Sequence, residues 1–89
     1  MLFALGQVVA TAGALDALEE AGQQPRELLM RHASGDWGDL SSDDRAENER
    51  SLKEGYRLLS AYTLSSGERL WVITEHDRSV TTLLLPDEY

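Results

Sequence analysis

The sequence predicts an α+β fold in which about three N-terminal helices precede a three-stranded antiparallel meander. Helical periodicity with capping residues extends to Gly55, and from Tyr56 onward it gives way to β-prone apolar runs joined by short turns. The length of 89 residues allows one small domain, 1–89, and excludes a second. Because cysteine is absent, packing alone must stabilise this domain.

A short β-prone segment at 7–10 precedes the first expected helix. Thr11 is a suitable N-cap for that helix, and Gly22 is a suitable end. Leu15 and Leu18 lie three residues apart and therefore share one helix face. We expect this face to pack against the core.

The second expected helix begins near Pro25, a residue that fits the first helical turn, and it stops near Gly35. Leu28, Leu29 and His32 form its apolar stripe. Because His32 lies on the leucine-bearing side, we expect it to pack or to bond a carbonyl rather than to bind a metal. The first two helices together form an αα-hairpin.

A third helix is expected over 42–54, with Ser41 as its cap. Ser41 and Asp44 have the spacing of a capping box, and acids early in a helix stabilise its positive N-terminus. Ala46 and Leu52 are its only apolar residues, so most of its circumference must remain in solvent. The helix is therefore either a solvated cover or a recognition surface.

Three strands are expected in the C-terminal part of the chain, within 56–64, 69–75 and 80–86. A Ser-Gly pair at 66–67 fits a two-residue hairpin loop, and residues 76–79 fit a four-residue loop. This register places two apolar sets on opposite faces of the sheet. One face carries Leu59, Ala61, Leu70, Val72, Leu83 and Leu85, and the other carries Leu58, Tyr62, Trp71, Ile73, Val80 and Leu84.

The helices of so short a chain can cover only one of these faces. We expect the main core between the helical hairpin and that face to consist of Leu15, Leu18, Leu28, Leu29, Leu59, Val72 and Leu83. The face that carries Trp71 then remains open and apolar, and large open apolar surfaces favour association. Two-fold pairing is the commonest way to bury such a face, so a homodimer is expected.

The charge of the chain limits its partners. Sixteen acidic residues against eight basic ones give a formal charge of −8, which repels phosphate backbones. Asp16, Glu19, Glu20 and Glu27 would oppose DNA binding by the helical hairpin. No apolar run approaches the roughly 20 residues of a membrane span, and the apolar start lacks the basic segment of a signal peptide. We therefore expect a cytoplasmic protein that binds neither nucleic acid nor membrane.

Reactive side chains concentrate at residues 76–79, where a histidine, an aspartate, an arginine and a serine are adjacent. Neighbours on an exposed turn point apart and remain hydrated, so we interpret this cluster as a turn and assign no catalytic residue. The alternative is a small ribonuclease or toxin in which His76 and Arg78 act on phosphate together with Thr81 or Thr82.

Metal and cofactor sites are not expected. Asp36, Asp39, Asp43 and Asp44 could approach a hard cation, but they lack the alternating oxygen ligands and central glycine of an EF-hand loop. Capping and solvation are the simpler interpretation of these acids. Two histidines without cysteine do not provide the four ligands of a structural zinc site.

A partner-binding surface is the remaining candidate site, and its proposed residues are Trp37, Asp43, Asp44, Glu47 and Trp71. Trp37 stands between two glycines of a loop. An indole in that position either packs back onto the core, which we favour, or projects as an anchor for a partner.

Four stretches of the chain resemble a family of short bacterial plasmid-related proteins: GQVVATAGALDALEEAG, RHASGDWGDLSSDDRAENERSL, LSAYTL and LWVITEHDRSVTTLLLPDEY. The resemblance spans nearly the whole chain and implies a mobile-element setting. Members sometimes carry a label as a type I restriction methyltransferase subunit. The residues give this label no support, because the chain has no cofactor loop and is too short for a methyltransferase fold.

The favoured hypothesis is a non-enzymatic, acidic protein–protein interaction module of mobile-element type that inhibits or regulates a host defence protein. The −8 charge and the polar third helix favour it. The alternatives are the ribonuclease described above and a structural module that associates only with itself.

Overall fold

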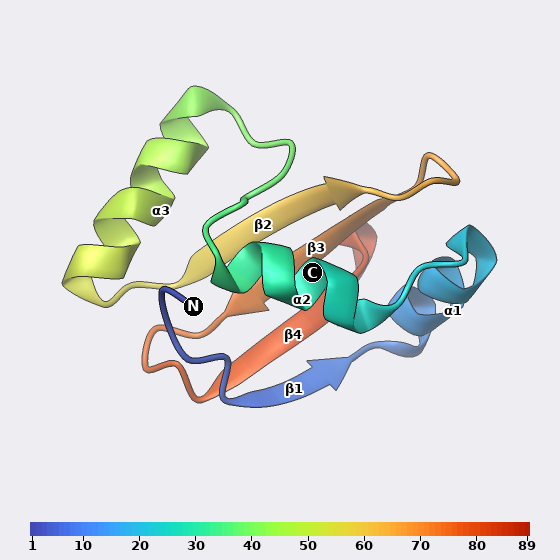
Figure 1. The fold of residues 1–89 in the computed structure, drawn as a ribbon, viewed down its shortest axis with the longest axis horizontal. Coiled ribbons are helices and arrows are strands. Elements are labelled where there is room, and N and C mark those ends of the chain that lie inside the picture. Colours follow the sequence, from blue (N-terminus) through green and yellow to red (C-terminus); the bar gives the residue numbers. More distant parts are fainter.

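The computed structural model describes all 89 residues and contains one mixed four-stranded sheet in the order β1-β4-β3-β2. Helices α1 and α2 lie over one face of this sheet, and α3 stands beside the edge strand β2 (Figure 1). The elements are β1 (Gln7–Ala10), α1 (Ala12–Ala21), α2 (Pro25–Ala33), α3 (Ser42–Glu54), β2 (Leu58–Thr63), β3 (Arg69–Thr74), β4 (Val80–Leu84) and a terminal 3-10 turn, η1 (Pro86–Glu88). The predicted α+β fold with three helices and a β2-β3-β4 meander is confirmed.

The N-terminal strand β1 is the element that the predicted meander lacked. It runs parallel to β4, with Val8 opposite Thr81, and the Gln7 N–H donates to the Ser79 carbonyl at 2.9 Å. The segment at 7–10 is thus a strand, as its composition indicates. Its pairing was not predicted, because nothing local in the sequence identifies a partner at the far end of the chain.

Helix ends follow the predicted capping chemistry. The Thr11 hydroxyl accepts a hydrogen bond from the Ala14 N–H at 3.0 Å, and the Ser41 hydroxyl accepts one from the Asp44 N–H at 3.1 Å. Gly55 ends α3 in the left-handed region at φ 79°, where a side chain would be strained. These bonds satisfy N–H groups that the helices themselves leave without a partner.

The hairpin between β2 and β3 differs from the prediction by one residue. The Leu64 N–H donates to the Glu68 carbonyl at 2.8 Å, so the loop holds the three residues 65–67 rather than two. Gly67 adopts φ 93°, the left-handed conformation that closes such three-residue loops. The predicted four-residue loop at 76–79 is confirmed, since the Glu75 N–H donates to the Val80 carbonyl at 3.0 Å.

The extra loop residue turns the whole of β2 over, because a shift of one residue exchanges the two faces of a strand. Tyr62 pairs with Leu70 and faces the helices, whereas it was expected on the Trp71 face. Ala61 pairs with Trp71 on the opposite face. The predicted faces of β3 and β4 are correct relative to each other, and those of β2 are reversed.

The core lies between α1, α2 and the sheet. Its buried cluster consists of Ala14, Ala17, Leu18, Leu28, Tyr62, Leu64, Leu70, Val72 and Leu83. Of the predicted core, Leu29 packs partly against this cluster, whereas Leu15 remains 49% exposed. Alanines at 14 and 17 together with Leu18 form the buried face of α1, which moves Leu15 outward. Leu59 is absent from this core because of the reversal of β2.

The second face of the sheet is largely shielded within the chain itself. Ala61, Ile73 and Leu84 are buried, and the Tyr89 ring packs against Trp71 with centroids 5.8 Å apart. In Figure 1 the C-terminal turn lies behind the sheet, on the side away from α2. The Arg57 guanidinium stands 5.3 Å from the centroid of the Tyr89 ring. The expected second copy is therefore not required to cover this face.

The assignment of the core predicts unequal effects for two leucines of the same helix. Leu18→Ala should lower the free energy of unfolding by about 2–5 kcal/mol, since it removes a fully buried side chain. Leu15→Ala should cost less than about 1 kcal/mol. Chemical denaturation followed by circular dichroism measures both, and equal losses would contradict the buried face of α1.

Candidate functional site

The residues of the alternative catalytic hypothesis do not converge. His76 is exposed in the turn between β3 and β4. Thr81 is buried on the face beneath the helices, and its neighbour Thr82 points to the opposite face. Arg78 reaches away from both toward the C-terminal end of α3. No single cleft brings these four side chains to one phosphate.

Residues 76–79 form the turn that the sequence predicts, and hydrogen bonds within the turn explain its acid. Asp77 Oδ1 accepts from the Ser79 hydroxyl at 2.6 Å and from the Ser79 N–H at 3.0 Å. The hydroxyl bond is the main cause of the lowered pKa of Asp77. This is the local side-chain to backbone bonding that is typical of turn aspartates.

Arg78 has a structural position that the sequence did not indicate. Its guanidinium donates to the Tyr56 carbonyl at 2.7 Å and to the Ser51 carbonyl at 3.0 Å, at the C-terminal end of α3. The Ser51 carbonyl also accepts from the N–H groups of Gly55 and Tyr56, so Arg78 adds a cation that complements the negative end of the helix dipole. Arg78 therefore joins the β3-β4 turn to α3, and its side chain is occupied by the fold.

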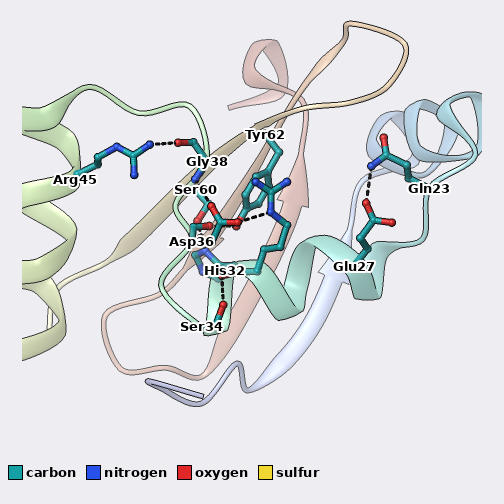
Figure 2. A network of polar contacts seen from close by, with 10 residues as sticks. Gln23, Glu27, His32, Ser34, Asp36, Gly38, Arg45, Ser60 and Tyr62 are labelled. Carbon is teal, nitrogen blue, oxygen red and sulfur yellow. Dashed lines mark hydrogen bonds and ion pairs between the residues drawn. The ribbon is translucent and has the colours of Figure 1, made fainter.

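The largest buried polar group is a hydrogen-bonded chain centred on His32. Its Nδ1 lies 2.6 Å from Ser60 Oγ and its Nε2 lies 2.9 Å from Thr74 Oγ1. Thr74 in turn lies 2.8 Å from Thr81 Oγ1, whose hydroxyl donates to the Leu5 carbonyl at 2.7 Å. His32 and Ser60 lie together beneath the loop that follows α2 (Figure 2). The chain thus links α2, three strands and the N-terminal arm.

The Leu5 carbonyl determines the direction of the bonds from Thr81 back to Nε2 of His32. A carbonyl only accepts, so Thr81 must use its single proton there and accept from Thr74. Thr74 then accepts from Nε2–H, and Nδ1 of His32 accepts from the Ser60 hydroxyl. Burial keeps the His32 ring neutral, so its single proton is on Nε2 and Nδ1 is free to accept from Ser60.

Burial makes this cluster structural rather than catalytic. His32 is 0% exposed, and the Phe3 and Trp37 rings pack against it with centroids 5.1 and 5.8 Å away. Desolvation, aided by the positive charge of Arg78, lowers the pKa of His32 to about 4. A Ser-His pair could act as nucleophile and base only if substrate reached it, and these rings exclude substrate.

From the sequence we predicted only that His32 is packed in the core, and not that it bonds Ser60 and Thr74. A signal was present, however: Ser60, Thr74 and Thr81 interrupt strands that are otherwise apolar at inward positions. Buried hydroxyls need partners, and a histidine on the facing helix supplies two. Correct register was needed to see that all three face His32.

The buried histidine predicts a loss of stability in mild acid. The pKa of His32 is about 4 in the folded protein and about 6.5 in the unfolded chain. The contribution of neutral His32 to stability is therefore fully present above pH 6.5 and is lost as the pH falls toward 4. We expect a loss of about 3 kcal/mol over this interval. Denaturant titrations at several pH values measure it.

His32→Gln is the control for this experiment. It should unfold more easily at pH 7, but its stability should change little between pH 6.5 and 5. The lowered pKa values of Asp36, Asp77 and Glu88 act in the same direction only below their ordinary values near pH 4. A wild type with flat stability across pH 6.5–5 would contradict the neutral, buried His32.

Trp37 is buried at 2% exposure, so it does not project as an anchor for a partner. Its Nε1–H donates to Glu49 Oε2 at 3.1 Å, which ties the loop to α3. Gly38 allows this close approach, because a Cβ at that position would lie 2.1 Å from the Ala61 carbonyl oxygen. The inward packing that we favoured from the sequence is observed.

Bonds at the end of α2 hold this loop in place (Figure 2). Arg31 Nε lies 2.6 Å from Asp36 Oδ2, and this bond is the main cause of the lowered pKa of Asp36. The Tyr62 hydroxyl donates to the Asp36 carbonyl at 2.6 Å, while the Arg31 guanidinium stacks 4.4 Å from the Tyr62 ring centroid. Asp36 is thus used by the fold and is not a free surface acid.

The remaining predicted partner-binding residues lie apart. Asp43, Asp44 and Glu47 are exposed on the N-terminal half of α3, and Trp71 is half-buried on the far side of the sheet. Asp43 and Asp44 occupy the first turn of α3, where their charge stabilises the helix. Helix stability alone therefore accounts for these two acids.

The acids of α1 have no such structural reason. Asp16, Glu19 and Glu20 are exposed, and none has an ion-pair partner. Glu19 and Glu20 lie in the last turn of α1, where negative charge opposes the dipole, whereas Asp16 lies near the middle of the helix. Asp16 and Glu20 are also separated by four residues, which places like charges next to each other. We therefore expect these acids to lower the stability of the fold.

A shallow groove lies beside these acids, between α1 and α2. It has a volume of about 330 Å³ and is lined by Leu15, Leu18, Glu19, Gln23, Gln24 and Pro25. The exposed Leu15 gives the groove an apolar wall, and Glu19 places a negative charge at its rim. The Gln23 side-chain amide donates to Glu27 Oε2 at 2.7 Å, and Figure 2 shows this bond beside the connection between α1 and α2. The groove therefore combines apolar and negative surface.

Neutralising acids on the two helices should change stability in opposite directions. The double variant Glu19→Gln/Glu20→Gln should unfold less easily, by about 0.3–1 kcal/mol for each charge removed near the negative helix end. Asp43→Asn/Asp44→Asn should unfold more easily by a similar amount. Thermal denaturation at low salt measures both, and destabilisation by the α1 variant would show that its acids serve the fold.

No three histidine, aspartate or glutamate side chains gather into a possible metal site, and none of the helices is long and apolar enough to cross a membrane. Comparison with protein families, curated proteins and solved structures found no match to this chain. The resemblance to plasmid-related proteins stays a prediction.

Proposed function

We propose that this chain is a non-enzymatic binding module that recognises a basic surface on another protein through α1 and the adjoining α1-α2 groove. The supporting observation is the placement of Asp16, Glu19 and Glu20. All three are exposed and unpaired, and Glu19 and Glu20 lie in the last turn of α1, where the helix dipole disfavours them. Residues that lower the stability of a small fold often serve function, as binding residues do.

The groove gives this acidic surface a means of selecting its partner. A basic side chain of the partner would meet Glu19 at the rim, while an apolar side chain beside it would contact Leu15. Apolar contact supplies affinity, and charge complementarity supplies orientation and a fast association rate. The partner is accordingly a protein segment that carries both basic and apolar side chains.

A protein partner fits the charge distribution better than nucleic acid does. Only three acids, Asp36, Glu47 and Glu54, take part in ion pairs, so most of the sixteen acids remain uncompensated. Phosphate backbones would be repelled by this excess. In a mobile-element setting, such a module would inhibit or regulate a host defence protein, for which a basic nucleic-acid-binding surface is a natural target.

The test is affinity capture from native host lysate followed by titration of the captured protein in purified form. The wild type should retain one stoichiometric partner whose affinity falls as salt rises. Glu19→Gln/Glu20→Gln should weaken the purified complex about tenfold, whereas Asp43→Asn/Asp44→Asn removes the same charge from α3 and should leave it nearly unchanged.

The two variants also distinguish this surface from the one predicted on α3. Equal weakening by both would show that net charge acts without a defined site. Weakening by the α3 variant alone would place binding at Asp43 and Asp44 and would contradict the proposal. Absence of any salt-sensitive protein partner would remove the function itself.

A further inference from the structure

The two edges of the sheet differ in how their backbone groups are covered. At the β2 edge, the Asn48 side-chain amide donates to the Leu59 carbonyl at 2.6 Å and accepts from the Leu59 N–H at 3.1 Å. The loop before α3 covers Ala61, the next outward-facing residue of the strand, since the Ala61 N–H donates to the Trp37 carbonyl at 3.1 Å. An edge that is occupied in this way cannot accept another strand.

The β1 edge has no comparable cover. The N–H groups of Gln7 and Thr11 donate to β4, so the intervening alternate residues, Val8 and Ala10, direct their N–H and C=O groups away from the sheet. No other element lies beyond β1 in Figure 1. Val8 is 43% exposed and Val9 is 40% exposed. The strand has no lysine, proline or other edge-protecting residue.

The charge pattern identifies what can pair with this edge. No residue from Met1 to Leu15 has a charged side chain, although the chain as a whole carries −8. Five of the eight exposed large hydrophobic residues also lie in this segment, so the neutral surface is the apolar one: Met1, Leu2, Val8, Val9 and Leu15. Two copies of so acidic a protein repel each other, and this repulsion is smallest where uncharged segments meet.

We propose that two copies of this chain pair through their β1 edges as antiparallel strands, which joins their sheets into one. The register follows from the outward groups, because pairing Val8 with Ala10 of the second copy uses the N–H and C=O groups of both residues in both strands. Val9 of one copy then lies directly opposite Val9 of the other, at a non-hydrogen-bonded position. The interface is isologous, as two-fold pairing requires.

This register makes a distance-specific test possible. The chain contains no cysteine, so Val9→Cys introduces one thiol, and facing residues of an antiparallel pair are close enough for a disulfide. Val9→Cys should be converted almost completely into a covalent dimer under mild oxidation. Met30→Cys, at a similar 45% exposure on α2, should remain mostly monomeric under the same conditions.

Two further variants test the hydrogen bonds and the neutrality of the edge in analytical ultracentrifugation. Val8→Pro removes an outward N–H without touching the bonds to β4, and Val9→Lys places two like charges opposite each other. Both should abolish the concentration-dependent dimer of the wild type. Met30→Lys should keep it, and circular dichroism should show that all of these variants fold.

Three results would overturn the proposal: a wild type that stays monomeric at high concentration, disulfide formation by Val9→Cys no faster than by Met30→Cys, or a dimer that survives both edge variants. Loss of a foreign protein partner in these variants, with a monomeric wild type, would assign the edge to another chain and would also overturn it. The dimer does not depend on the α1 acids, so Glu19→Gln/Glu20→Gln should leave it intact.

Discussion

The hydrogen-bonded chain through His32 is the constraint on which the rest of this fold depends. It requires Ser60 of β2 and Thr74 of β3 to face the same histidine, and only the three-residue loop at 65–67 places them on one face. With a two-residue loop, Ser60 would lie on the opposite face and His32 would lose a bond in a dry interior, at a cost of about 1–3 kcal/mol. Register, helix position and the path of the N-terminal arm are therefore specified together.

The same polar chemistry determines what each part of the surface is free to do. Arg78 belonged to the alternative catalytic hypothesis and Trp37 to the predicted partner-binding surface, yet the Ser51 and Tyr56 carbonyls bind the first and Glu49 binds the second. The hydrogen-bonding groups of both side chains hold α3 and the loop before it against β2, and this covers that edge of the sheet. The surfaces without such internal partners are the acidic face of α1 and the edge of β1.

Local sequence patterns predicted the parts of the fold that depend on local physics. Thr11 and Ser41 cap helices because their hydroxyls reach N–H groups three residues away, and the turn at 76–79 closes with its own aspartate. The reversal of β2 followed from a single loop residue, which hydrophobic alternation could not detect because both faces are apolar. The pairing of β1 with β4 depends on contacts between the two ends of the chain, for which the sequence contains no local signal.

The candidate surfaces show the same division between local and long-range causes. The excess of acid was visible in the composition, but its significance lies in position: Asp43 and Asp44 stabilise the start of α3, whereas Glu19 and Glu20 oppose the end of α1. The acids begin at Asp16, directly after the uncharged segment, so the proposed α1 contact is charged and the proposed β1 contact is not. Salt should therefore affect the two contacts in opposite ways. Screening weakens attraction between α1 and a basic partner, while it relieves the repulsion between two acidic copies that meet at β1. One small chain can thus carry a salt-sensitive and a salt-tolerant interface without either interfering with the other.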